Sequence, residues 1–168
     1  VVKEQELQVL VLHLQTLAND AAEITRQFLS DLFQQVYLLC MQNEMNTKKV
    51  AVLQDVMLTI IDDTDAILSD FEYFRLDAWI NAARKYGGDS REEQDYLEWN
   101  ARNLVTRWGP NAEINDYSSR EWNGLMSAYY KERWHLFFEH ANVAKFEQAF
   151  QRQTVDDIVD INENNYKQ

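Results

Sequence analysis

The scarcity of helix-breaking residues constrains this chain more than any other feature of its sequence. Only 4 glycines and 1 proline occur among 168 residues. Globular proteins on average carry about 7% glycine and about 5% proline. Hydrophobic residues make up 46% of the chain and aromatic residues 12%, enough to build a core. These features predict an all-α fold, a single-domain helical bundle of about six to eight helices over residues 1–168.

Charge, cysteine content and the length of apolar runs exclude several classes of partner, site and segment. The formal net charge is -12, and the isoelectric point is about 4.6. Nucleic-acid backbones and anionic membranes bind basic patches, so we expect neither as a partner. Cys40 is the only cysteine, which rules out an internal disulfide and a thiolate zinc cluster. The longest aliphatic run, residues 9–12, is far shorter than the roughly 18 residues of a membrane span.

Apolar side chains at three- and four-residue spacing predict two helices in the first 42 residues. The first stripe consists of Leu7, Leu10, Leu14 and Leu17. We expect this helix to end at Asn19–Asp20, because Asp20 and Glu23 have the spacing of a capping box that starts a second helix. The second stripe, predicted to be core, consists of Ile24, Phe28, Leu32, Val36 and Leu39.

The apolar spacing over residues 47–65 predicts a third helix, which follows a polar link. Its inward-facing side chains are expected at Val50, Leu53, Met57 and Ile60. A break or kink is expected at residues 62–65, where three aspartates lie within four positions. A calcium loop of the EF-hand type needs a glycine at its sharp turn and a glutamate at its twelfth position, and this run has neither. We therefore interpret the aspartates as a solvated helix surface or helix end.

Glycines and caps divide the second half of the chain. A helix over residues 75–86 is predicted to end at Gly87–Gly88, a C-cap sequence. Ser90 with Glu93 forms a capping box for the next helix. The apolar stripe of that helix consists of Leu97, Ala101, Leu104, Val105 and Trp108. A neighbouring polar stripe, which either faces solvent or packs on another domain, consists of Tyr96, Asn100, Asn103 and Arg107.

Residues 100–134 distinguish this chain from a generic helical domain. The helix is cut at Trp108-Gly109-Pro110, because proline fixes φ and removes a donor. The loop over residues 113–117 mixes charge, amide, apolar and phenol groups, a mixture that suits a sugar-binding rim. Ser118 with Glu121 is predicted to cap an aromatic helix that starts at Trp122. The aromatic side chains of that helix are expected to pack in the core or against another domain.

A complete catalytic or metal-binding set cannot be assembled from the sequence. Glu132 and His135 have the Glu-x-x-His spacing of di-iron bundles, but neither of the other two histidines has a glutamate three residues before it. We therefore expect no metal and no cofactor. Glu113 and Asp116 could be read as a glycosidase acid pair, although an exposed turn and a helix cap explain them better. We assign no catalytic residue.

Four motifs follow one another between residues 99 and 134. They are RN-x-V-T-x-WGP from Arg102, I-N-DY from Ile114, W-x-GL from Trp122 and YY-x-x-RW from Tyr129. Together they resemble the C-terminal helical domain of the α-N-acetylglucosaminidase family of glycoside hydrolases. Weaker similarity extends to residues 25–27, 79–84 and 146–150, so the resemblance covers most of the chain after Asp20.

The resemblance implies a role for this chain within a larger enzyme. Enzymes of that family have a small N-terminal domain, a (β/α) barrel and a helical domain that packs on the barrel. They remove terminal α-linked N-acetylglucosamine from glycans with retention of configuration, using two barrel glutamates that lie outside this chain. The resemblance also implies that Trp108, Ile114 and Tyr117 line part of the substrate pocket. The expected partners are the barrel of the same protein and a glycan substrate.

Further expectations concern the source of the chain and an alternative function. Because the chain begins at Val1 instead of methionine, we expect a fragment of a longer protein. No Asn-x-Ser/Thr acceptor occurs, which favours a bacterial periplasmic or secreted enzyme over a lysosomal one. The alternative function is a free-standing helical protein-interaction module, which a barrel upstream of Val1 would exclude.

Overall fold

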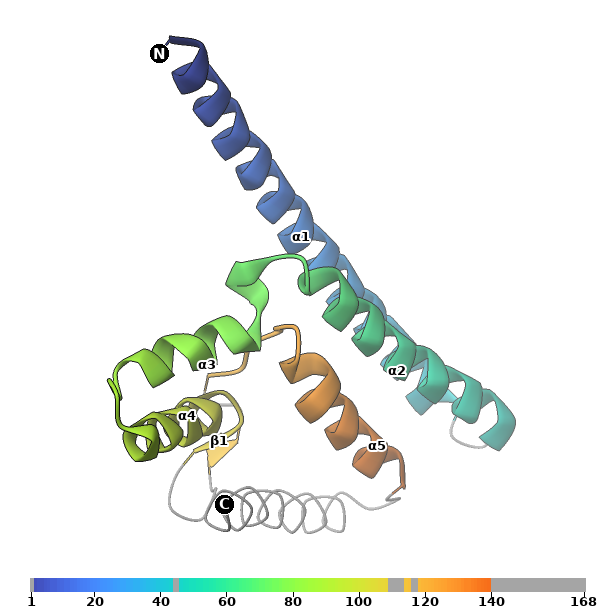
Figure 1. Ribbon diagram of the computed structural model, residues 1–168. Coiled ribbons are helices and arrows are strands. Elements are labelled where there is room, and N and C mark those ends of the chain that lie inside the picture. The colour runs from blue at the N-terminus through green and yellow to red at the C-terminus, as the bar shows by residue number, and fades with distance from the viewer. Residues whose placement is uncertain (1, 44–45, 109–113, 116–117, 140–168) are drawn as a thin grey trace. The chain divides into compact units, whose positions relative to one another are not determined.

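The computed structural model describes residues 2–43, 46–108, 114–115 and 118–139 (Figure 1). Helices dominate these residues, so the all-α prediction is confirmed. The α-helices are α1 (Val2–Gln42), α2 (Thr47–Leu68), α3 (Leu76–Lys85), α4 (Arg91–Val105) and α5 (Lys131–Glu139). The shorter elements are a 3-10 helix η1 (Glu72–Phe74), a π-helix η2 (Met126–Tyr130) and two strands, β1 (Arg107–Trp108) and β2 (Ile114–Asn115).

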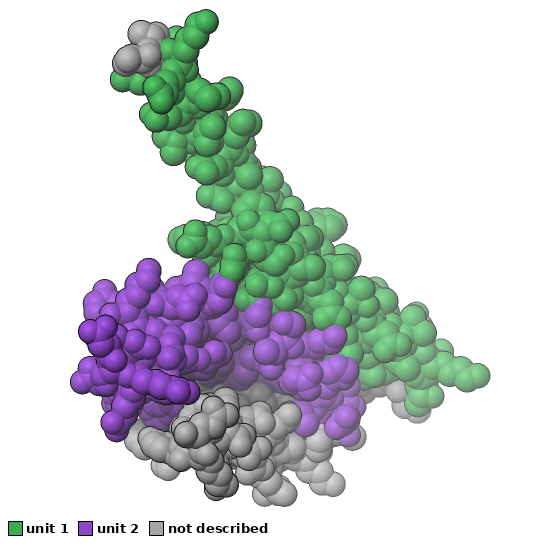
Figure 2. Space-filling view, viewed as in Figure 1, with its two compact units in different colours: residues 1–75, 121–123 green, residues 76–120, 124–168 purple. Residues whose placement is uncertain are grey.

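The chain divides into two compact units (Figure 2). The first comprises residues 1–75 and 121–123, and the second comprises residues 76–120 and 124–168. Residues 121–123 therefore belong with the first unit, although their neighbours in sequence belong to the second. Since two compact units can form one domain, the single domain over residues 1–168 stays a prediction. Within the described ranges, no helix combines the length and the apolar character that crossing a bilayer requires.

Helix α1 runs without interruption from Val2 to Gln42, so the helix end predicted at Asn19–Asp20 is wrong. No glycine or proline precedes Gly87 in the sequence. An asparagine or aspartate inside a helix costs only about 0.7 kcal/mol relative to alanine, and packing overrides a cost of that size. Glu23, expected to cap a new helix, instead accepts a hydrogen bond from Arg26 one turn further along α1.

Helix α2 continues through the three aspartates to Leu68, so the break expected at residues 62–65 is also wrong. Thr64 lies within this run and is buried, and its hydroxyl donates to the carbonyl oxygen of Ile60 at 2.7 Å. This bond keeps the threonine hydroxyl satisfied inside the helix. Asp62 and Asp63 are exposed, which agrees with their interpretation as a solvated helix surface.

The core of the first unit lies where the second half of α1 packs on α2. Its buried apolar side chains are Ala22, Val36, Cys40, Met57, Ile60, Ile61, Leu68 and Phe74. The core stripe predicted on α1 is wrong except at Val36, because Ile24 is 70% exposed and Phe28 is 61% exposed. A residue two positions after Ala22 lies about 200° further round the helix axis, so Ile24 faces away from α2.

Ile24 and Phe28 instead extend the leucine stripe of the first helical turns. The set comprises Leu7, Leu10, Leu14, Leu17, Ile24 and Phe28, each of them more than half exposed. We call this set the α1 stripe. When Ala21, which lies between Leu17 and Ile24, is counted with them, the members repeat at three- and four-residue spacing along one face of α1. An apolar face of this length, left in water, is typical of a surface that meets another protein segment.

In the second unit, α3 and α4 pack on each other. Ile80 of α3 is buried, as are Ala101 and Val105 of α4, and the indole N–H of Trp79 donates to the carbonyl oxygen of Ala101 at 3.0 Å. The turn between the helices follows the prediction from Gly87–Gly88. Gly88 adopts a φ of 56°, in the left-handed region that favours glycine.

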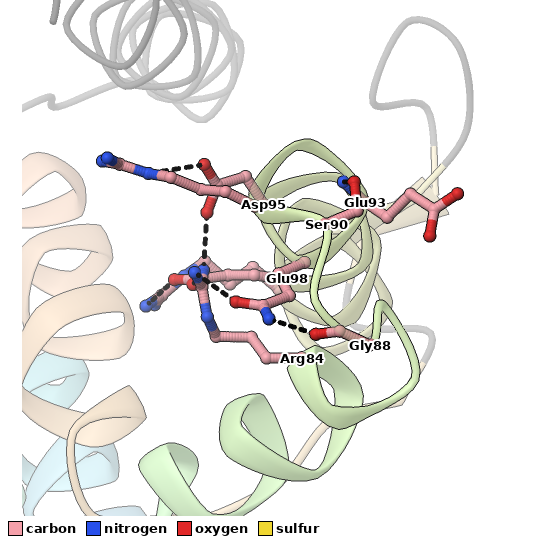
Figure 3. A network of polar contacts seen from close by, with 9 residues as sticks. Arg84, Gly88, Ser90, Glu93, Asp95 and Glu98 are labelled. Carbon is pink, nitrogen blue, oxygen red and sulfur yellow. Dashed lines mark hydrogen bonds and ion pairs between the residues drawn. The ribbon is translucent and has the colours of Figure 1, made fainter.

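A network of charged side chains also joins α3 to α4 (Figure 3). Arg84 of α3 contacts the carboxylates of Asp95, at 2.8 Å, and Glu98 of α4. Glu98 also accepts two hydrogen bonds from Arg102, one helical turn further on. Burial by itself raises the pKa of Glu98, but the hydrogen bonds from Arg102 and Arg84 outweigh it and lower that pKa. The Arg84 side chain therefore bridges two turns of α4.

The aromatic helix predicted from Trp122 begins later than expected. Residues 121–123 are not helical, Leu125 is the first helical residue, and η2 follows it. The capping box predicted for Ser118 and Glu121 is therefore wrong, and Glu121 bonds to α1 instead. The segments at residues 109–113, 116–117 and 140–168, which contain Glu113, Asp116 and the similarity at residues 146–150, lie outside the described residues.

Candidate functional site

Helix α4 leads directly into the candidate site. Ser90 caps its start, since the hydroxyl oxygen accepts from the backbone N–H of Glu93 at 3.3 Å, as predicted. The helix ends at Val105, and Thr106 leaves the helical conformation with a φ of -121° and a ψ of -87°. The Thr106 hydroxyl donates to the carbonyl oxygen of Arg102 at 2.8 Å, which satisfies one of the carbonyls left open at the end of a helix.

Strands β1 and β2 form a short antiparallel ladder immediately after α4. Its register pairs Trp108 with Ile114, so the backbones of two of the three residues expected to line a pocket lie opposite each other. Residues paired in this way have Cα atoms about 4.5–5.5 Å apart. The sequence predicted a polar loop here and not this pairing, because two-residue strands carry no periodic pattern. Tyr117, the third residue, lies outside the described residues.

The π-helix η2 supports the start of this ladder. Tyr129 is buried, and its phenol O–H donates to the carbonyl oxygen of Thr106, the residue before β1, at 3.3 Å. The ring of Tyr129 meets that of Tyr130 edge to face, with 5.0 Å between the centroids. A π-helical turn holds one more residue than an α-helical turn, and such turns occur frequently at functional sites. The core role expected for the aromatic rings holds for Tyr129.

Glu121, four residues after Tyr117, bonds to side chains of α1. Its carboxylate accepts hydrogen bonds from the guanidinium of Arg26 at 2.9 Å and from the hydroxyl of Ser30 at 2.7 Å. Burial by itself lowers the pKa of Arg26, but its hydrogen bond to Glu23 and the charge of Glu121 outweigh burial and raise that pKa above the ordinary value. Arg26 therefore stays charged, and its interaction with Glu121 is a charge-assisted hydrogen bond.

Trp122 and Asn123 contact other parts of the same unit. Trp122 packs against a buried cluster made up of Ala22, Leu68 and Phe74. The side-chain amide of Asn123 donates to the carbonyl oxygen of Asp65 at 3.0 Å and to its carboxylate at 2.9 Å. The backbone N–H of Asn123 donates to the carbonyl oxygen of Phe74 at 2.8 Å. These contacts were not predicted from the sequence, because their members lie far apart along the chain.

The described residues contain no group of three or more His, Cys, Asp or Glu side chains placed to hold a metal ion. His135 of α5 is half-buried, and Glu132 is exposed. At the start of β1, the hydroxyl of Tyr129 donates to the carbonyl oxygen of Thr106.

Comparison with known proteins identifies the family. The family model described as the alpha-N-acetylglucosaminidase (NAGLU) C-terminal domain matches residues 4–168. The chain therefore belongs to the family of C-terminal domains of α-N-acetylglucosaminidases, as the motifs of residues 102–134 indicated.

Two relatives show the same relationship. Human alpha-N-acetylglucosaminidase is 29% identical over 123 residues, which cover 71% of this chain and 16% of the human protein. A family 89 glycoside hydrolase from Clostridium perfringens, solved in complex with PUGNAc, is similar with a TM-score of 0.70 and 29% identity. That similarity covers 80% of this chain and 17% of the solved chain. This chain thus spans about a sixth of the length of either relative.

Proposed function

We propose that this chain is the helical C-terminal domain of an enzyme that hydrolyses terminal α-linked N-acetylglucosamine from glycans. The family match over residues 4–168 carries this proposal. The two catalytic glutamates belong to a barrel domain of the same protein, outside this chain. The contribution of this domain is to pack on the barrel and to supply part of the wall of the substrate pocket.

The pocket wall consists of Trp108, Ile114 and Tyr117 in this proposal. The register of β1 with β2 supports it, because the backbones of Trp108 and Ile114 lie opposite each other. An indole and an isoleucine offer apolar surface to a sugar face or to an N-acetyl methyl group, and a phenol can hydrogen-bond a ring hydroxyl. A wall of this composition binds an uncharged sugar without charged groups of its own.

The surface that meets the barrel is the α1 stripe in this proposal. Most of the large exposed apolar side chains of the described residues lie on α1, with Leu17 at 63% and Ile24 at 70% exposure. By contrast, Trp134 and Phe137 of α5 are half-buried and contact each other with 5.3 Å between their centroids. Docking through the aromatic helix stays a prediction, but these two side chains are less exposed than those of the α1 stripe.

The test compares the full-length protein that carries this chain with the 168-residue chain alone. We expect the full-length protein to release the chromophore from a chromogenic aryl α-N-acetylglucosaminide, with retention of configuration at the released sugar. We expect the isolated chain to release none, because it lacks the carboxylate pair that glycoside hydrolysis requires. Turnover by the isolated chain that is lost on changing Glu113 or Asp116 would move the catalytic site into this domain.

A further inference from the structure

We propose that the first turns of α1 are enclosed in a groove of the same protein, which covers a second face of the helix in addition to the α1 stripe. The groove belongs to the part of the protein outside this chain. This inference rests on the proposed function, in which the α1 stripe meets the barrel, and adds a second covered face to it. We call this second face the rear face, and it consists of Val9, Leu12 and Thr16.

The first observation is the exposure of these turns. Every residue over the range 3–20 is exposed, whereas Ala22 is buried in the core of the first unit. Val9 is 51% exposed and Leu12 is 61% exposed, close to the 53% of Leu10 in the α1 stripe. Most helical stability in proteins comes from packing against other elements, and these turns bury little of their surface against the described residues.

The second observation is that the apolar side chains of these turns point in two directions. Successive residues of an α-helix lie about 100° apart around the axis, so Leu12 points about 200° away from Leu10 of the α1 stripe. Val9 and Leu12 are three positions apart and share a face. Thr16, one turn further on, donates its hydroxyl to the carbonyl oxygen of Leu12 at 3.0 Å. Because this hydroxyl is satisfied within the helix, the rear face needs no polar partner for it.

The third observation is that residues 7–18 carry no charge at pH 7, although 26% of the chain is charged. A helix that lies flat on a protein surface has one apolar stripe and a charged or polar face opposite it. Here Val9 and Leu12 occupy the opposite face, and a helix that is apolar on several sides is typically buried. Gln8 and Gln15, two turns apart beside Leu12, mark the side that we expect to stay in water.

The rest of the same protein is the occupant that these observations favour. In the proposed function this chain is one domain of a larger enzyme, and it spans about a sixth of the length of either relative. The rest of such an enzyme offers enough surface to cover two faces of one helix. Helices that lie on anionic membranes carry lysines and arginines on their polar face, and residues 7–18 have neither.

The test measures how fast a maleimide reagent labels single introduced cysteines in the full-length protein. Leu14→Cys reports on the α1 stripe and Leu12→Cys on the rear face. Gln15→Cys is the matched control on the side expected to stay open. The rate for each native variant is compared with its rate in urea, which corrects for the intrinsic reactivity of the thiol. Labelling of the wild-type protein, in which Cys40 is buried, gives the background.

We expect Leu12→Cys and Leu14→Cys to label about 100-fold more slowly in the native protein than in urea, because a covered thiol reacts only when the structure opens locally. Gln15→Cys should label in the native protein nearly as fast as in urea. Hydrogen exchange of the wild type needs no variant and serves as a second measurement. The amides of residues 7–18 should exchange as slowly as those of residues 29–40, which include the core positions of α1.

Fast labelling of Leu12→Cys together with slow labelling of Leu14→Cys would place the helix flat on a surface and overturn the enclosure. Fast hydrogen exchange over residues 7–18 would overturn it as well. Protection of Leu12→Cys that is lost on dilution would assign the rear face to a second copy of the protein, against the inference. A full-length protein that folds but hydrolyses no α-N-acetylglucosaminide would refute the proposed function, and the labelling rates would still decide whether both faces are covered.

Discussion

At the scale of single residues, Trp108 and Tyr117 make the pocket wall testable. In the full-length enzyme, Trp108→Ala should lower kcat/KM with a nearly unchanged melting temperature, because a pocket residue acts on the substrate more than on folding. Tyr117→Phe should lower kcat/KM by less, since a lost hydrogen bond to an uncharged group costs about 0.5 to 1.5 kcal/mol. Steady-state kinetics and thermal melting of the same preparations measure both effects.

A purely structural role for Trp108 predicts a different result. Truncating a buried tryptophan in a core costs about 3 to 5 kcal/mol, which would appear as a large fall in melting temperature. Activity would then be lost only through unfolding. Normal kinetics in a well-folded Trp108→Ala enzyme would exclude the β1–β2 hairpin from the active site.

At the scale of elements, the α3–α4 pair depends on the ionised form of Glu98. Its pKa in the folded chain lies below the usual value of 4.5, so the folded state binds the proton less tightly than the unfolded state does. The stability that this group contributes is therefore complete above the unfolded pKa and is lost as pH falls through the folded pKa. We expect Glu98→Gln to destabilise the protein at pH 7 and to have a smaller effect below about pH 4.

Thermal melting of the wild type and Glu98→Gln across pH 3 to 7 measures this difference. Glu93→Gln is the matched control, because Glu93 is an exposed glutamate of the same helix whose backbone N–H, and not its carboxylate, makes the cap contact. A difference between wild type and Glu98→Gln that stays constant over the acid range would show that the carboxylate charge adds nothing to the helix pair.

At the scale of the whole molecule, the α1 stripe should govern association. We expect the isolated 168-residue chain to self-associate, since free apolar surface of this extent rarely stays monomeric. Leu14→Glu with Leu17→Glu should weaken that association. Gln15→Glu, which adds one charge on the same helix off the stripe, should leave it intact. Sedimentation over a range of protein concentrations measures all of these, and a strictly monomeric wild type would contradict docking through the stripe.

Local signals in the sequence were sufficient for several features. The low glycine and proline content predicted the all-α class, and the Ser90 cap and the Gly87–Gly88 turn follow from the chemistry of two or three adjacent residues. The motifs of residues 102–134 indicated the family that the family model confirms. Features of this kind depend on backbone conformation over short distances, so neighbouring residues are enough to determine them.

Tertiary contacts determined the features that local sequence signals did not predict. The free-energy cost of keeping Asn19 and Asp20 inside a helix is less than about 1 kcal/mol per residue, and packing overrides a cost of this size. Which face of α1 is buried depends on where α2 packs, and periodicity alone placed Ile24 and Phe28 on the wrong side. Glu121 has the spacing of a helix cap, yet it bonds to Arg26 and Ser30. Partners more than 90 residues away compete with local ones only in the folded chain. There, packing of the core has already offset the entropy cost of bringing the distant residues together.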